Sequence, residues 1–195
     1  MDVSPIATHE ARRDDQQPRA HYLVGDARHL PFASSSFALI LSASSLDHFL
    51  DSADLGRSLL ELKRVLQPGG RLIITLDNRH NVFDPLLRLA IRLGLVPYYI
   101  GRSYTVRELR EELERAGLEV RDTTAIIHHP RLVAVALVRL ANALGVPPIT
   151  RLVRRALASA QRLQDTRWQY RMGCFVAALA VRPCAPATEV ALRRG

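Results

Sequence analysis

Residues with acid–base or hydrogen-bonding side chains follow short apolar runs in this sequence. Asp26 and Ala27 come directly after HYLVG, residues 21–25, and His48 follows the run FALILSA by a few residues. An ionised carboxylate only accepts hydrogen bonds, so Asp26 suits an amine donor on a ligand. A neutral imidazole such as that of His48 can orient a reacting group or remove a proton from it. The alternatives are that Asp26 only caps a turn and that His48 is a structural histidine.

A second set of polar residues lies beside this pattern. Asp47 precedes His48, and Asn78 and His80 come at the end of the run RLIITLDN, residues 71–78. Asp47 is expected to begin a helix, orient a neighbour or contact a substrate. Asn78 and His80 are either substrate-binding residues at a strand end or ordinary turn formers, a position that Asn favours.

Two hydrophobic periods alternate along the chain and predict the elements that position these residues. Ser52 is a candidate cap for the first helix, and Thr105 with Glu108 has the spacing of a capping box for the second. Pro68 to Gly70 predicts a turn, and Gly117 a helix end. The expected strands are 21–25, 37–43, 71–78, 118–128 and 173–183, and the expected helices are 53–66 and 105–116.

Strands that alternate with helices predict an α/β domain with a mostly parallel sheet. Residues 1–20 form a polar leader that we expect to be poorly ordered, and 21–183 form the domain. Within it, residues 79–104 and 129–172 read as helical insertions, and 184–195 as a tail. Connections at the carboxyl ends of strands build ligand sites in open α/β sheets, so the first insertion is a candidate cap over the substrate.

Bulk properties limit the classes of protein to consider. The chain has 195 residues, 48% of them hydrophobic, which is enough for one sizeable core. Its net charge of +8 comes almost entirely from arginine, since Lys63 is the sole lysine. That charge reflects either genomic base composition or attraction to nucleic acid, an anionic membrane surface or an acidic substrate.

Cysteine and histidine usage predicts neither a disulfide nor a metal site. Cys174 and Cys184 form no CxxC pair, and His128 and His129 have no carboxylate or cysteine at ligand spacing. The leader lacks the apolar middle of a secretory signal, and no apolar run is long enough to span a bilayer. We therefore expect a cytoplasmic protein, or at most one that lies on a membrane surface.

The motifs together resemble a known family. GDARHLPFASSSFALILSASSLDHF, followed by LLELKRVLQPGGRLIITLDN, is similar to the middle and second half of class I S-adenosylmethionine-dependent methyltransferases of the small-molecule type called type 11. The resemblance covers about residues 21–128, and the strand at 173–183 is consistent with it. It implies a Rossmann-like fold of three layers with a mostly parallel sheet and an antiparallel last strand.

The resemblance also implies roles for individual residues. Asp26 would accept a hydrogen bond from the adenine amino group, and the backbone N–H of Ala27 would face the ring. Ser42, Ala43 and Ser44 would pass close to the sulfonium of S-adenosylmethionine. The segment SASSLDHF lacks the Asn/Asp-Pro-Pro-aromatic motif of enzymes that methylate bases, which disfavours nucleic acid as the acceptor.

One part of the family pattern is missing. No GxG turn occurs, and residues 1–20 contain no apolar run, so the family's first two strands have no counterpart. In the family order three-two-one-four-five-seven-six, this leaves the strand at 37–43 with an unpaired edge. We expect a truncated form of a longer enzyme; the alternatives are a remnant that pairs 21–25 directly with 37–43, and a chain whose sheet is completed by a partner or a second copy.

The leading functional hypothesis is methyl transfer from S-adenosylmethionine to an oxygen, nitrogen or carbon of a small molecule. A second is a non-catalytic binding or regulatory subunit that pairs with a complete partner. A third is membrane-surface association through the arginine-bearing helices expected at 84–94 and 150–163, whose alternative is ordinary packing with solvated arginines.

Overall fold

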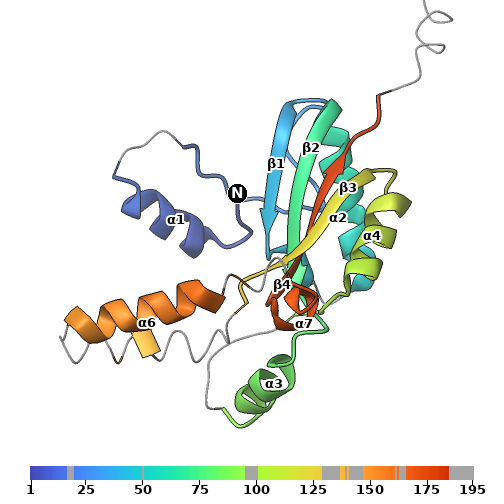
Figure 1. Ribbon diagram of the computed structural model, residues 1–195. Helices are drawn as coiled ribbons and strands as arrows, with labels where there is room; N and C mark the ends of the chain where they lie inside the picture. The colour runs from blue at the N-terminus through green and yellow to red at the C-terminus, as the bar shows by residue number, and fades with distance from the viewer. Residues whose placement is uncertain are drawn as a thin grey trace, which may run out of the picture.

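A four-stranded sheet forms the centre of the protein (Figure 1). The computed structural model describes residues 1–16, 20–49, 51–94, 101–128, 137–138, 140, 147–160, 162 and 166–184. The strand order is β1-β2-β4-β3, in which β1 and β2 are parallel and β4 is antiparallel to both of its neighbours. This confirms an α/β fold whose last strand runs against the others. The strands are β1 (Phe37–Ala43), β2 (Leu66–Asp77), β3 (Glu119–Ile126) and β4 (Phe175–Val181).

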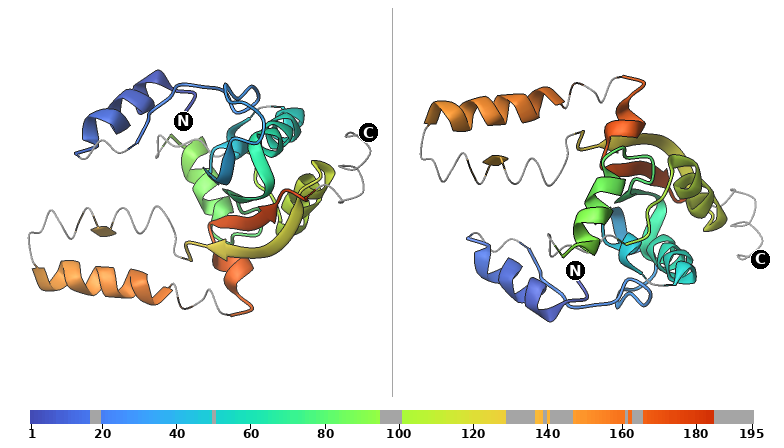
Figure 2. Two further views of the ribbon diagram at one scale, coloured as in Figure 1. Left: turned by 90° about the horizontal axis from the view of Figure 1, so that it is seen from above. Right: turned by 90° about the horizontal axis from the view of Figure 1, so that it is seen from below.

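Two amphipathic helices cover one face of the sheet. Figure 2 shows α2 (Ser52–Val65) and α4 (Val106–Arg115) on the same side of the strands. Their leucines recur at helical spacing and are buried against alternate residues of β2 and β4. This packing forms the core, which includes Leu55, Leu59, Leu62, Leu72, Ile74, Leu76, Leu109, Leu113, Val176 and Ala180.

The opposite face of the sheet is far more open. Leu39 and Leu41 of β1 are 49% and 66% exposed, and Ile73 of β2 is 38% exposed. Within the described part of the chain, the third layer implied by the resemblance is therefore not seen over these side chains. β1 is also the last strand on its side of the sheet, so it presents an open edge.

Local signals set most helix boundaries. The capping box predicted for α4 is present, with Thr105 and Glu108 exchanging side-chain and backbone hydrogen bonds. The predicted cap Ser52 is wrong by one residue, because Asp51 accepts the N–H of Ala53 at the start of α2. Gly117 follows α4 with φ of +73°. A Cβ there would lie 2.3 Å from the Nζ of Lys63, the far end of a flexible side chain on α2, so the left-handed backbone is the stronger reason for glycine at this position.

The predicted strand 21–25 is wrong. Val24 forms an isolated parallel bridge with Asp2, and the N–H of Gly25 donates to the Asp2 carbonyl at 2.9 Å. This segment pairs with the N-terminal residues and does not join β1, which also contradicts direct pairing of 21–25 with 37–43. A short apolar run is compatible with a strand, but the strand forms only if the rest of the fold provides a neighbouring strand to pair with.

The predicted turn at Pro68 to Gly70 is part of β2 instead. Gly69 donates to the carbonyl of Arg182, and the N–H of Arg182 donates to the carbonyl of Gly70. The guanidinium of Arg182 also donates to the carbonyls of Lys63 and Leu66, at and just beyond the last turn of α2. One side chain thus ties the end of β4 to the junction of α2 and β2.

Further helices flank the sheet in the described part of the chain. Within the leader, 1–20, the structure places an exposed helix, which the sequence pattern did not predict. The two expected insertions do contain helices, and Figure 1 shows α3 and α6 projecting away from the sheet. His129 and the tail beyond residue 184 lie outside the described residues. The helices are α1 (Pro5–Asp14), α3 (Asp84–Arg92), α6 (Pro147–Ala160) and α7 (Gln169–Met172).

Among the described residues, no helix combines the length and apolar character needed to cross a bilayer.

Candidate functional site

Two adjoining cavities lie beside β1. The first, here called the polar cavity, has a volume of about 380 Å³ and is lined by residues 1–3, 25–28, 44–46, 48 and 49. The second, the apolar cavity, has a volume of about 460 Å³ and runs along β1, lined by residues 39–43 together with Leu30, Phe32 and others. Ala27 and Ser45 line both cavities. Each volume falls in the range of about 300–1,000 Å³ that is typical of ligand pockets.

The structure brings most of the predicted site residues to these cavities. Asp26, Ala27, Ser44 and His48 line the polar cavity. Ser42 and Ala43 line the apolar cavity, where Ala27 appears again. The five residues expected to bind the cofactor therefore converge from two segments, the loop at 25–28 and the end of β1. Their individual roles stay predictions.

Asp26 is already engaged by a neighbour that the sequence pattern did not single out. The carboxylate accepts the backbone N–H of Arg28 at 2.8 Å and its guanidinium at 2.7 to 3.0 Å. These hydrogen bonds hold the pKa of Asp26 at about 2, below its ordinary value of 3.8. Arg28 also donates to Asp54 of α2 at 2.8 Å and lies over the ring of Phe49.

The contacts of Arg28 bear directly on ligand binding. A carboxylate offers about four acceptor positions, and the backbone and guanidinium of Arg28 use both oxygens of Asp26. An amine donor therefore reaches this carboxylate when Arg28 gives up part of its contact. The sequence carried one signal for this pair, namely an opposite charge two residues after Asp26.

The end of β1 is held in an unusual conformation. Ser44 has φ of +45°, a left-handed value that non-glycine residues seldom adopt. Its backbone N–H donates to the carbonyl and the hydroxyl of Thr75 on β2, both at 3.0 Å. Its own hydroxyl donates to Oδ2 of Asp47 at 3.3 Å. These bonds hold the backbone of Ser44 as it turns from β1 into the short helical turn η1 (Leu46–His48) that carries His48.

Asp47 occupies a different place from the one expected for an acceptor-binding residue. Its side chain is fully buried, and it is not among the residues that line either cavity. Oδ2 accepts the backbone N–H of Asp77 at 2.9 Å, which ties η1 to the end of β2. Burial, and then the negative charge of Asp77, raise the pKa of Asp47 above its ordinary value.

A third segment closes over Asp47 from the other side. The backbone N–H of Arg102 donates to the carbonyl of Asp47 at 2.7 Å. A Cβ at Gly101 would lie only 1.9 Å from that carbonyl oxygen, so this approach requires glycine. The carboxyl ends of β1 and β2 and the segment before α4 therefore meet at Asp47, the first two through its carboxylate and the third through its backbone carbonyl.

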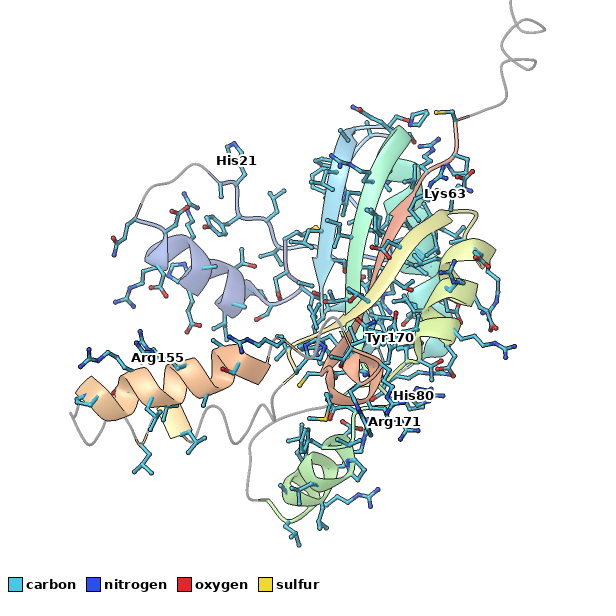
Figure 3. The ribbon with its side chains drawn as sticks, viewed as in Figure 1. His21, Lys63, His80, Arg155, Tyr170 and Arg171 are labelled. Atoms are coloured by element: carbon cyan, nitrogen blue, oxygen red, sulfur yellow. The ribbon has the colours of Figure 1, made fainter. Side chains whose placement is uncertain are left out.

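Asn78 and His80 lie apart from these cavities. The side-chain amide of Asn78 donates to the carbonyls of Tyr170 and Gly173 at 2.7 and 2.8 Å, and its Oδ1 accepts the N–H of His80. Asn78 is thus buried and used to anchor α7 against β2. The side chain of His80 is exposed at the same end of the sheet as Tyr170 and Arg171 (Figure 3). Neither residue lines the two cavities, so acceptor binding by them stays a prediction.

Charges of both signs line the polar cavity. The carboxylates of Asp2 and Asp26 lie there together with the guanidinium of Arg28, which is paired with Asp26. The side chain of His48 is 40% exposed there, which leaves its imidazole accessible to a bound molecule. Within the described part of the chain, no group of three or more His, Cys, Asp or Glu side chains could hold a metal ion.

Comparisons with known proteins find similarity to methyltransferases. The family described as "Methyltransferase domain" matches residues 1–74. A probable S-adenosylmethionine-dependent methyltransferase of Mycolicibacterium smegmatis is 31% identical over 143 residues, which are 73% of this chain and 50% of that protein. A malonyl-[acyl-carrier protein] O-methyltransferase of Methylococcus capsulatus is 31% identical over 149 residues, 76% of this chain and 52% of that protein. The chain spans about half the length of these relatives.

Solved structures show the same fold. An S-adenosylmethionine-dependent methyltransferase of Methanosarcina mazei superimposes with a TM-score of 0.59 at 16% identity, covering 94% of this chain and 81% of that one. The sheet order β1-β2-β4-β3 and the antiparallel β4 are the four-five-seven-six half of the family order. The matched family, the relatives and the fold together make this chain a member of the class I S-adenosylmethionine-dependent methyltransferase family.

Proposed function

We propose that the protein transfers the methyl group of S-adenosylmethionine to an oxygen, nitrogen or carbon atom of a small-molecule acceptor. The observation that carries the proposal is the polar cavity, where Asp26, Ala27, Ser44 and His48 come together. The relative that methylates malonyl-[acyl-carrier protein] supports an oxygen acceptor on a short acyl group. A relative that is similar over a shorter stretch of 69 residues, a ubiquinone/menaquinone biosynthesis C-methyltransferase of Haemophilus ducreyi, supports a carbon acceptor.

In this proposal, different residues of the two cavities hold the cofactor and the acceptor. The cofactor supplies an electrophilic methyl group when bound. Asp26 and the backbone of Ala27 hold its adenine, and residues 42–44 line the side toward the methyl group. His48 orients the acceptor or receives its proton. Holding two reactants in line contributes about 7–11 kcal/mol of barrier lowering, so positioning is the main contribution asked of this site.

Calorimetric titration with S-adenosylhomocysteine, the product form of the cofactor, tests the proposal. We expect a dissociation constant in the micromolar range, weakened about tenfold or more by Asp26→Ala, since a bond to a charged group contributes about 1.5–3 kcal/mol. The matched control is Asp122→Ala, which removes an exposed carboxylate from β3, away from both cavities. A folded chain that binds no S-adenosylhomocysteine, or equal weakening in both variants, would overturn the proposal.

A second candidate is a non-catalytic subunit whose sheet is completed by a partner chain or a second copy. The open edge of β1 favours it, because FALILSA carries no charged residue or proline that would block strand pairing. Sedimentation velocity separates the candidates. We expect self-association of the wild-type chain that Leu41→Lys reduces; a strictly monomeric wild-type chain would count against pairing at this edge.

We also propose that the protein contacts a membrane surface through α3 and α6. Leu86 and Leu89 of α3 and the C-cap residue Leu93 are 64%, 51% and 63% exposed and share one face, beside the exposed Arg92. Arg155 is exposed on α6, a helix that projects away from the sheet (Figure 3). Such helices bind anionic lipid in a salt-sensitive way. Co-sedimentation with anionic vesicles tests the contact, and a failure to bind at low salt would exclude it. We also propose the cytoplasmic location that the sequence predicts, with the membrane contact made from that side.

A further inference from the structure

One buried oxygen beside the polar cavity has no hydrogen bond within the described part of the chain. Oδ2 of Asp47 accepts the N–H of Asp77 and the hydroxyl of Ser44, whereas its Oδ1 accepts none from the described residues. A buried polar atom without a partner is costly, so such atoms commonly mark a function. Oδ1 is therefore the acceptor position that needs an explanation.

The imidazole of the neighbouring residue lies near this oxygen. Nε2 of His48 lies 4.0 Å from Oδ1 of Asp47. The two residues differ sharply in exposure, since Asp47 is fully buried and the His48 side chain is 40% exposed and lines the polar cavity. The imidazole therefore stands between the cavity and a buried carboxylate.

We propose that Asp47 is a positioning residue that holds the imidazole of His48 as the proton acceptor of the reaction. This inference rests on the proposed function. The bond between hydrogen and the acceptor atom breaks, and an electron pair of the acceptor atom forms the new bond to the methyl carbon. The electron pair of the broken carbon–sulfur bond stays on sulfur. The proton moves to Nδ1 of His48, while Nε2–H turns toward Oδ1 of Asp47 and the carboxylate stabilises the imidazolium. The proton then leaves to solvent from the exposed side of the ring.

The surroundings of Asp47 make the pKa of its carboxyl sensitive to the charge on His48. Asp47 faces Asp77 from the end of β2 and Arg102 and Tyr104 from the segment before α4. Burial and Asp77 raise the pKa of Asp47, whereas positive charge on His48 lowers it. Protonation of His48 therefore favours ionised Asp47, which is the linkage that a proton acceptor requires.

NMR titration of the Asp47 side-chain carboxyl carbon tests the pairing without any assay of activity. We expect His48→Gln to raise the pKa of Asp47 further, because the positive charge that opposes the raise is lost. The matched control is His29→Gln, another exposed histidine, which lines neither cavity. Equal titration of Asp47 in the wild type and both variants would overturn the proposal. His48 is exposed, so its variant is expected to fold.

Kinetics of methyl transfer then test the role. Asp47→Asn keeps an oxygen for the N–H of Asp77 but removes the charge, and Asp51→Asn removes a nearby charge while keeping a competent helix cap. We expect Asp47→Asn alone to lower kcat about tenfold with unchanged binding of S-adenosylhomocysteine, since general base catalysis is worth about 10²- to 10⁴-fold.

The outcomes separate this inference from the proposed function. An unchanged kcat in Asp47→Asn, in a chain that binds S-adenosylhomocysteine and methylates an acceptor, would overturn the role of Asp47 alone. A chain in which His48→Gln raises the pKa of Asp47 but that binds no S-adenosylhomocysteine would overturn the proposed function, and the proton transfer with it. If Asp47→Asn does not fold, the His48→Gln titration decides.

Discussion

Replacing Gly101 by alanine is expected to disturb the site from outside the cavity. A Cβ at this position would lie 1.9 Å from the carbonyl oxygen of Asp47 and 2.9 Å from the Cα of His48. Ordinary contacts of a Cβ atom are more than 1 Å longer than this 1.9 Å separation, so the backbone around residue 101 must move. The 2.7 Å hydrogen bond from Arg102 to Asp47 is then stretched or broken.

The size of the effect follows from these contacts. A broken buried hydrogen bond costs about 1–3 kcal/mol and local backbone strain about 1–3 kcal/mol. We expect Gly101→Ala to lower the free energy of unfolding by about 2–4 kcal/mol, and Tm by roughly 5–15 °C for a chain of this length. Urea and thermal unfolding followed by circular dichroism measure both quantities.

A second glycine provides the control. A Cβ at Gly56 of α2 would meet nothing within 4 Å, and alanine is favoured over glycine inside a helix by about 1 kcal/mol. We therefore expect Gly56→Ala to keep or raise stability. A loss below about 0.5 kcal/mol in Gly101→Ala, which is the scale of ordinary surface substitutions, would refute the packing argument for residues 101 and 47.

Three other substitutions test the contacts around the site and core. In Arg28→Met, the pKa of Asp26 should rise from about 2 toward 3.8, measured by NMR titration of its carboxyl carbon. The pair stabilises the fold above about pH 4, and this contribution is lost as the pH falls through about 2; an unchanged pKa would contradict the pairing. Arg182→Met should cost about 1–3 kcal/mol in urea unfolding, because carbonyls at the end of α2 lose a charged donor. Thr105→Ala should cost about 1 kcal/mol through loss of the α4 cap, and Thr105→Ser should restore most of it.

Elements with strong local signals were predictable. The strand at 37–43 has the predicted bounds, and the capping box at Thr105 begins α4 as expected. Both depend on a few neighbouring residues, an apolar run in one case and a three-residue spacing in the other. The strand order was predictable only through the resemblance, because pairing between distant strands leaves no mark in a single sequence.

The site was predictable as a set of residues but not as a set of contacts. The end of the strand at 37–43 indicated where Ser44 and His48 would lie, and the polar cavity contains both together with Asp26, which follows no strand. The burial of Asp47 was not predictable, because it depends on Asp77 and on residues 101 and 102, which are far away in the sequence. The segment 21–25 failed as a strand for the same reason, since its apolar pattern did not specify a partner.

The contact between Lys63 and Gly117 has a practical consequence for chemical labelling. Lys63 is the sole lysine in the chain, and it lies partly buried where α2 meets α4. An amine-reactive fluorophore would therefore modify one side chain besides the terminal amine, without any engineered cysteine. Because that ammonium becomes more accessible when the two helices separate, its rate of acylation reports on opening of the core under native conditions.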